Sequence, residues 1–381
     1  MSNTLHTLYV NAMKPQSFAS WAKPKAEDLN IPRKRYLNEA NEVVWNIGEE
    51  KGSCADHIEM AGFYASTIIS YGKDAKGRLK LMKHLVVPTL RTQPNVTQSS
   101  FCYNFNASPV DVKVNHKKVV EYPKEISVKG NLKINSLTDS DVSVIREFVP
   151  AVQQPALIEI IHICNNGSSD CTVEICAKPF SKKLNAYFCV DGAITAKCVS
   201  AFGDVFNASS KENRKLTLKS KDSIKLYAVY YAYRKKDLAD FSIVNEIEAR
   251  RKFVDEMFTS LRLETPIKEL NAQFSHCVLR GSESIFKTQN GLMHAPGGGN
   301  YYAALWTNDQ CEYANPFFPF SGYTAGIEQS INCYSLYESY MDKSDKPMAE
   351  KRALVTSIIS GGTDFWNGAG DRGDGEMYAY G

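Results

Sequence analysis

The change of hydrophobic period near residue 242 constrains this chain more than any other feature. From about residue 41 to 240, short runs rich in Val, Ile, Tyr, Phe and Thr are split by Gly, Asn, Asp and Lys. Residues 67–72, 157–163 and 223–231 are three such runs, and residues 73–78 have the composition of a hairpin turn. Many short strands with regular turns and no interleaved helices predict an antiparallel β-sandwich.

Beyond residue 242 the apolar residues recur at helical spacing. Steps of three, four and seven separate Ile243, Ile247, Val254, Met257 or Phe258, and Leu261, which predicts a helix to about residue 262. The polar face of this helix is assigned to Glu246, Glu248, Arg250, Arg251 and Lys252. Further helices are predicted over 267–286, after a proline that suits a first helical turn, and over 325–341.

The predicted fold class is therefore β + α and multidomain, with the sheets first and the helices second. Residues 1–40 are polar and punctuated by prolines, and we expect an N-terminal arm there. The β-sandwich domain spans 41–240, a linker helix spans 241–264, and a helical region spans 265–381.

Composition excludes several functional classes. The formal net charge of +3 argues against a nucleic-acid partner, because such proteins carry strongly basic patches. No run reaches the ~18 apolar residues of a membrane span, and residues 1–18 lack the apolar core of a signal peptide. We expect a cytoplasmic protein, or a periplasmic or secreted one if a signal was removed. The ten cysteines form no CxxC pair, and buried free thiols in a reducing compartment explain them.

Three glycine-rich segments concentrate the residues that could carry chemistry: 291–302, 303–320 and 362–377. Each mixes aromatic, amide and carboxyl side chains. Sugar rings stack their C–H faces on aromatic rings and direct their hydroxyls to polar groups, so such a mixture suits a carbohydrate pocket. Glycosidic cleavage uses a pair of carboxyl groups. The available carboxylates are Asp309, Glu312, Asp371, Asp374 and Glu376.

Simpler explanations exist for each of these features. The three glycines at 297–299 lack the Lys-Ser/Thr of a phosphate loop and suit a flexible connector. Trp306 could belong to the core, and Asp371 could form an ion pair with Arg372. Asp374 could cap a helix that begins near Gly375. His294 fits a hydrogen-bonded loop histidine better than a general base.

The segments 306–309 and 367–374 resemble the active-face loops of six-hairpin glycosidases, a group of bacterial enzymes that includes α-L-rhamnosidase-like members. In the front half, residues 56–62, 70–72 and 88–91 are similar to the β-supersandwich domains of that group. The resemblance implies that an (α/α)6 toroid begins after the sandwich. It also implies hydrolysis of O-glycosidic bonds in oligo- or polysaccharides, with inversion favoured by analogy.

The resemblance implies roles for individual residues. Trp306 would be a stacking platform and Asp309 would bind hydroxyls, while Asp371, Asp374 or Glu376 would supply the acid. The other predicted substrate-binding residues are Tyr302, Asn308, Glu312, Trp366 and Arg372. No cofactor and no metal are expected, because no His/Cys/Asp cluster has ligand spacing.

In one respect the sequence departs from the six-hairpin pattern, and this affects which partners we expect. Residues 265–381 hold too few helices for a complete toroid, and the late catalytic carboxylate of such enzymes has no counterpart here. We therefore expect that more of the chain, a second chain or a second copy completes the helical domain, unless the few helices fold back onto the sandwich. Two alternatives to a hydrolase stay open: a sugar phosphorylase on the same scaffold, and a non-catalytic glycan-binding or assembly protein.

Overall fold

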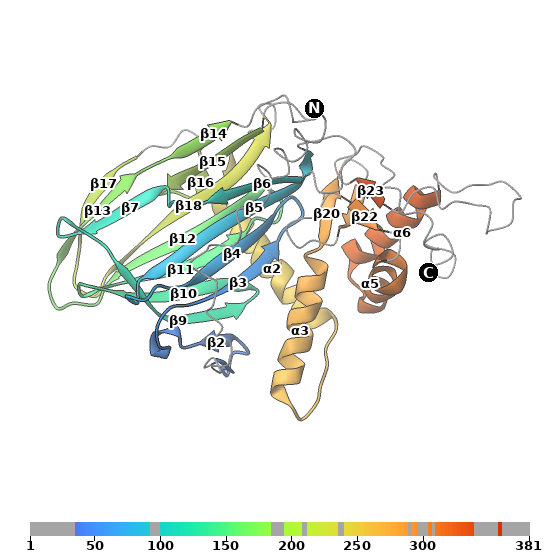
Figure 1. The fold of residues 1–381 in the computed structure, drawn as a ribbon, viewed down its shortest axis with the longest axis horizontal. Coiled ribbons are helices and arrows are strands. Elements are labelled where there is room, and N and C mark those ends of the chain that lie inside the picture. Colours follow the sequence, from blue (N-terminus) through green and yellow to red (C-terminus); the bar gives the residue numbers. More distant parts are fainter. Residues whose placement is uncertain are drawn as a thin grey trace, which may run out of the picture.

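The computed structural model describes residues 35–91, 100–183, 194–207, 212–234, 240–288, 291–295, 304–306, 309–338 and 357–359. Strands come first and a few helices follow, with the helices gathered at one end of the strands (Figure 1). The predicted fold class, mostly antiparallel sheets followed by helices, is confirmed. In the part of the chain described, no helix is long and apolar enough to cross a membrane.

One layer of the sandwich is a nine-stranded sheet in the order β1-β2-β9-β10-β11-β12-β18-β15-β14, antiparallel throughout. The end of the expected N-terminal arm belongs to this sheet, because its first strand lies before residue 40. The strands are β1 Arg35–Leu37, β2 Val43–Trp45, β9 Glu121–Lys129, β10 Asn131–Thr138, β11 Val142–Pro150, β12 Ala156–Asn165, β18 Ser223–Arg234, β15 Ile194–Ala201 and β14 Phe180–Lys183.

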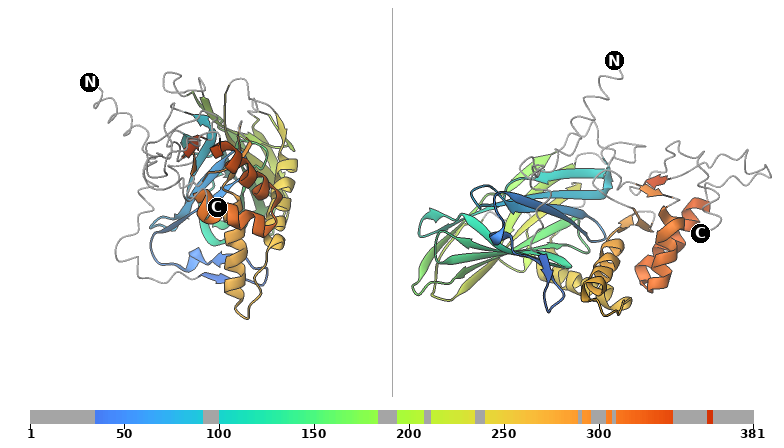
Figure 2. Two further views of the ribbon diagram at one scale, coloured as in Figure 1. Left: turned by 90° about the vertical axis from the view of Figure 1, so that its right-hand side faces the viewer. Right: turned by 60° about the horizontal axis from the view of Figure 1, so that its bottom comes forward.

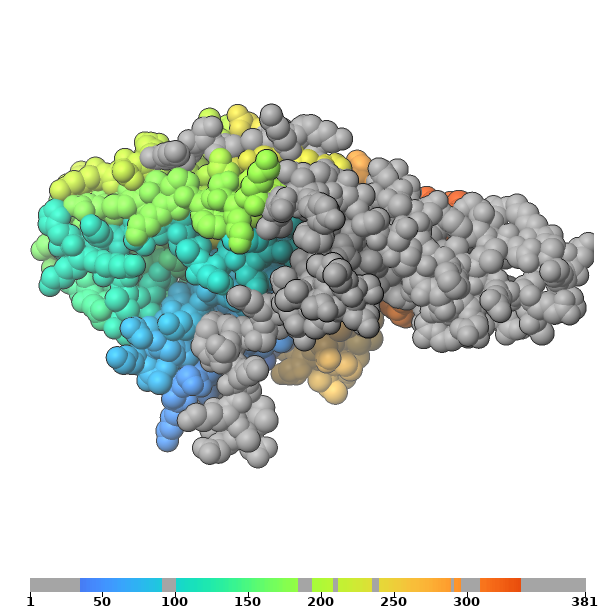
Figure 3. All heavy atoms as spheres, turned by 45° about the horizontal axis from the view of Figure 1, so that its top comes forward, coloured from blue at the N-terminus to red at the C-terminus, as the bar shows by residue number. Residues whose placement is uncertain are grey.

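The opposite layer consists of two four-stranded sheets, ordered β3-β4-β5-β6 and β17-β13-β7-β8. The two layers are visible in Figure 2, and Figure 3 shows the coloured strands packed as one solid mass. The strands are β3 Cys54–Ala61, β4 Ser66–Lys73, β5 Leu79–Arg91, β6 Ser100–Phe105, β17 Arg214–Leu218, β13 Cys171–Ala177, β7 Val110–Val114 and β8 Lys117–Lys118.

The main hydrophobic core lies between these layers. Alternate residues of each strand point inward, as the period of two in a strand requires. From β12, Leu157, Ile161 and Ile163 enter this core, while Ile158 and Ile160 face the other side of the sheet. From the opposite layer, β5 contributes Leu85 and other strands contribute similar side chains. The sandwich is therefore filled from both layers.

The helix α2 (Ile243–Ser260) links the sandwich to the helical end. Ser242 caps it, since its side chain accepts a hydrogen bond from the backbone N–H of Asn245. At its start, Ile243 packs on the outer face of the nine-stranded sheet beside the short pair β16 (Val205–Phe206) and β19 (Phe241–Ser242). At its end, Met257 joins the core of the helical region. One helix thus contacts both parts of the molecule.

The predicted polar face of α2 is wrong at two positions. Glu246 is buried and accepts hydrogen bonds from the backbone N–H groups of Val152 and Gln153. Arg250 is completely buried and donates to the backbone oxygens of Ala61 and Gly130. Both lie on the face that packs on the sandwich, where exposed backbone groups of the sheet ends need partners. Of the remaining three residues of the predicted face, Arg251 and Lys252 are exposed and Glu248 is half-buried.

The helical end contains α3 (Lys268–Ser282), α5 (Asn315–Ser321) and α6 (Thr324–Glu338). The helix predicted over 267–286 ends early, because Ile285–Thr288 forms β20, which pairs with β21 (Gly291–His294) in a hairpin. This places Phe286 against Val86 of the sandwich. Between α5 and α6, Gly322 adopts a left-handed conformation (φ 71°) that favours glycine and ends the first helix.

Candidate functional site

The strand that carries Trp306 lies beside a strand from the end of the chain. β22 (Ala304–Trp306) pairs with β23 (Ser357–Ile359), and Trp306 is opposite Ser357. In the sequence, β23 ends two residues before the predicted carboxylate segment 362–377, which lies outside the described residues.

A turn of π-helix follows β22 and holds two of the predicted carboxylates. It spans Gln310–Ala314, with Asp309 immediately before it and α5 immediately after. Turns of π-helix are rare and occur frequently at functional sites. Tyr313 donates its hydroxyl to the carboxylate of Asp309, which is half-buried, while Glu312 is exposed. Burial, the hydrogen bond to Asp309 and the charges of Asp309 and Glu312 all raise the pKa of Tyr313. Two carboxylates and a phenol thus share one turn.

The buried side chain of His294 packs against this π-helical turn and is hydrogen-bonded to its first residue, Gln310. It lies at the end of β21 rather than in the expected loop, and it is buried between the rings of Tyr313 and Phe318, each 5.9 Å away between ring centroids. The side-chain amide of Gln310 donates to His294 Nδ1 (2.9 Å) and to the backbone oxygen of His294 (3.0 Å). The ring proton of the neutral imidazole therefore belongs on Nε2. Burial lowers the pKa of His294 to about 4, so the ring is neutral at physiological pH.

A second set of buried polar groups ties the same strand to α6. Gln329 accepts from the backbone N–H of His294 (3.1 Å) and donates to Asn315 (3.4 Å) and Ser330 (2.9 Å). These bonds link β21, α5 and α6 through buried polar side chains. The linked side chains position Asp309 and Glu312 but are not themselves placed to exchange protons.

The other predicted site residues lie outside the described residues, and only the backbone of Trp306 is described. This concerns the substrate-binding predictions Tyr302, Asn308, Trp366 and Arg372 and the catalytic predictions Asp371, Asp374 and Glu376. Their roles stay predictions. In the ranges that the structure describes, no group of three or more His, Cys, Asp or Glu could hold a metal ion.

Comparison with known proteins gives distant likeness among solved structures alone. No protein-family model matches the chain, and no curated protein matches it. Among solved structures it is similar to a bacterial glucoamylase complexed with acarbose, with a TM-score of 0.33 and 10% sequence identity. The match covers 88% of this chain and 55% of the glucoamylase, so the chain spans about half the length of that protein. Such a likeness concerns the fold and assigns no substrate and no catalytic group.

Sequence analysis missed two sets of residues. Gln310 was not singled out, although it orients His294. A cluster of charged side chains inside the sandwich was also missed, and it includes Lys83, Arg146 and Glu159. The available signal was a charge at an inward position of an otherwise apolar strand, such as Glu159 between Leu157 and Ile161.

Proposed function

We propose that this chain is a carbohydrate-active protein of the glycoside-hydrolase type, which hydrolyses O-glycosidic bonds of oligo- or polysaccharides by carboxylate acid/base catalysis. The observation that carries the proposal is the π-helical turn after β22, where Asp309 and Glu312 follow the Trp306 strand. An aromatic platform beside hydrogen-bond acceptors is what a sugar ring needs, and the sequence resemblance to six-hairpin glycosidases supports the same reading.

The roles follow from chemistry. Asp309 accepts a hydrogen bond from Tyr313, which holds its carboxylate in one orientation and leaves acceptor capacity for sugar hydroxyls. Trp306 serves as the stacking platform, and the exposed Glu312 contributes a second acceptor. Proton donation to the leaving oxygen is assigned to the segment that follows β23, with Asp371, Asp374 and Glu376 as its candidates.

The test is turnover of a panel of aryl glycosides by the full chain, with and without inorganic phosphate. The single variants Asp371→Asn, Asp374→Asn and Glu376→Gln are compared with Asp255→Asn, an exposed carboxylate on α2. We expect phosphate-independent hydrolysis, and we expect one of the three variants to lower kcat by about 10²–10⁴-fold. Asp255→Asn should leave kcat unchanged.

Each rival gives a different result. Turnover that requires phosphate would replace hydrolysis with a sugar phosphorylase. Glycan binding that survives all three substitutions, with no turnover of any substrate, would contradict the hydrolase proposal and leave a non-catalytic glycan-binding protein.

A further inference from the structure

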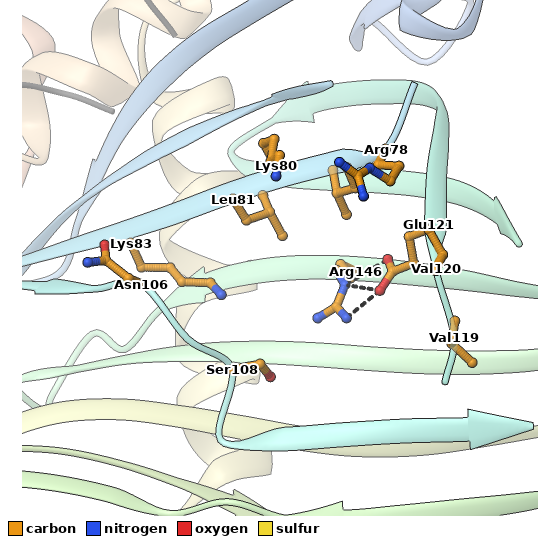
Figure 4. A pocket seen from close by; sticks show the side chains of 11 residues that line it. Arg78, Lys80, Leu81, Lys83, Asn106, Ser108, Val119, Val120, Glu121 and Arg146 are labelled. Carbon is orange, nitrogen blue, oxygen red and sulfur yellow. Dashed lines mark hydrogen bonds and ion pairs between the residues drawn. The ribbon is translucent and has the colours of Figure 1, made fainter. Parts of the chain in front are cut away.

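A pocket of about 320 Å³ opens into the sandwich at the seam between its two smaller sheets (Figure 4). The start of β5 forms one wall, and the connection from β6 to β7 and the start of β9 form the others. Arg146 of β11, from the nine-stranded sheet, lies at the floor. The volume is at the lower end of the ~300–1,000 Å³ usual for ligand sites, so it has room for one small molecule.

Ionised side chains at the floor of this pocket form a buried network. Arg146 donates from Nε and Nη2 to Glu121 (2.9 and 2.6 Å) and from Nη1 to Glu159. Glu159 is completely buried and also accepts from the hydroxyl of Tyr230 (2.6 Å). The ammonium of Lys83, whose side chain is only 5% exposed, lies 3.5 Å from the second oxygen of Glu159 and 5.0 Å from the ring centroid of Tyr230.

The network has donors to spare. A guanidinium has five N–H groups, and the bonds of Arg146 to Glu121 and Glu159 leave one N–H on Nη1 and one on Nη2. Lys83 has three N–H groups and, in the part of the chain described, one carboxylate partner at long range. Both carboxylates are already bonded to Arg146. Arg146 and Lys83 therefore present N–H groups that can donate to acceptor oxygens of a ligand, beside the carboxylate of Glu121, which also lines the pocket.

The charge balance favours an anion over a neutral acceptor. At the rim, Arg78 and Lys80 share a single carboxylate, Asp74. At the floor, Lys83 and Arg146 face Glu121 and Glu159. One positive charge is thus left unbalanced across rim and floor. Buried charges that carry spare donors need an acceptor of opposite charge or water.

We propose that this pocket binds a small hydroxylated organic anion, with its carboxylate or phosphate against Lys83 and Arg146. Hydroxyl groups of the ligand would meet Ser108 on the connection from β6 to β7, and Asn106 lies beside Lys83 at one end of the pocket (Figure 4). In Figure 4 the ends of Lys83 and Arg146 point toward one another. The buried carboxylate of Glu159 bridges these two groups, so the ligand would meet only the N–H groups that they turn toward the pocket. This site shares no residue with the proposed glycosidase turn and does not depend on it.

The test is isothermal titration of the full chain with three probes of similar size: D-glucuronate, D-glucose 6-phosphate and D-glucose. We expect at least one of the two anions to bind with a Kd of about 1 mM or tighter, and D-glucose to bind at least about tenfold more weakly. The two anions separate a carboxylate ligand from a phosphate ligand.

Variants test whether the anion binds in this pocket. The double substitution Arg78→Gln/Lys80→Gln changes only exposed rim residues and should weaken anion binding by about fivefold. Its control, Arg251→Gln/Lys252→Gln, removes the same charge from exposed positions on α2 and should leave the Kd unchanged. Lys83→Met, checked for folding by circular dichroism, should weaken binding by at least about tenfold.

Three results would overturn the proposal. The first is the absence of heat with both anions at about ten times the expected Kd. The second is equal binding of D-glucose. The third is an equal loss of affinity in the rim pair and in the α2 control pair, which would place the anion elsewhere.

Discussion

Glu159 is the buried carboxylate that Lys83 and Arg146 share inside the sandwich. Burial alone would raise its pKa, but the charges of Lys83 and Arg146 and the Tyr230 hydroxyl outweigh burial and lower it to about 2. Because the folded pKa lies below the ordinary value of 4.5, this group stabilises the fold fully above about pH 4.5. The contribution is lost as pH falls from 4.5 toward 2.

Glu159→Gln should therefore lower the free energy of unfolding at pH 7 by about 3–5 kcal/mol, because it leaves two buried cations without their shared anion. Denaturant unfolding measures the effect. Glu248→Gln, which changes a half-exposed carboxylate on α2, should change stability by no more than about 0.5 kcal/mol. Equal stability of the two variants would mean that the network contributes nothing.

His294 makes a separate prediction about pH. Its folded pKa of about 4 lies below the ordinary 6.5, because burial opposes the charged ring. Protonation therefore favours the unfolded state, and the fold should lose up to about 3 kcal/mol as pH falls from 6.5 to 4. His294→Gln should reduce the dependence of the melting temperature on pH between pH 6.5 and 4. The exposed His116→Gln is the control and should keep the wild-type slope.

For single residues, the sequence predicts the face of a strand on which a side chain lies better than it predicts which side chains it contacts. The alternation in residues 157–163 predicts a strand and places Glu159 on the same face as Leu157 and Ile161. Its partners Lys83 and Arg146 lie on β5 and β11, and no local pattern pairs them. Asp309 and Tyr313 are four residues apart, but their contact depends on a π-helical turn, which has no signature in hydrophobic periodicity.

Among the elements, α2 joins the sandwich to the helical end through one side chain. Arg250 bonds the backbone oxygens of Ala61 and Gly130, the side chain of Asn131, and the carboxylate of Glu283, the residue directly after α3. The sequence predicted the helix from its apolar stripe. It could not predict that Arg250 turns inward, because that depends on carbonyl groups supplied by distant strand ends.

Arg250→Met should lower the free energy of unfolding by about 3–5 kcal/mol, since it leaves buried acceptors unsatisfied. It should also speed hydrogen exchange in α2 and α3. The neighbouring Arg251→Met removes an exposed arginine and should stay within about 0.5 kcal/mol of wild type. If both variants had the same free energy of unfolding and the same exchange rates, Arg250 would not be what holds the sandwich and the helical end together.

For the whole molecule, the helical end leaves several large apolar side chains exposed. Within the range 267–286, predicted as a helix, Val278 and Ile285 are buried, whereas Ile267 and Leu270 are exposed. On α5 and α6, Phe320 is 76% exposed and Ile331 is 65% exposed. Apolar side chains of this kind often mark interaction surfaces. That a further chain or a second copy covers them stays a prediction.

Replacing Phe320 and Ile331 together by Ser should reduce binding of an apolar dye and weaken any self-association seen by analytical ultracentrifugation. The melting temperature should change little, because neither side chain contributes to the core. Dye binding and sedimentation identical to wild type would exclude these residues from an interface.

A carbohydrate ligand is common to the hydrolase, to the phosphorylase and to the binding protein, so the most direct measurement is a glycan array probed with the full chain. We expect retention of at least one class of glycan, and we expect Trp306→Ala and Asp309→Asn to abolish it, while Arg251→Gln does not. The account would be contradicted if no glycan were retained at saturating protein, or if both site variants retained the same glycans as wild type.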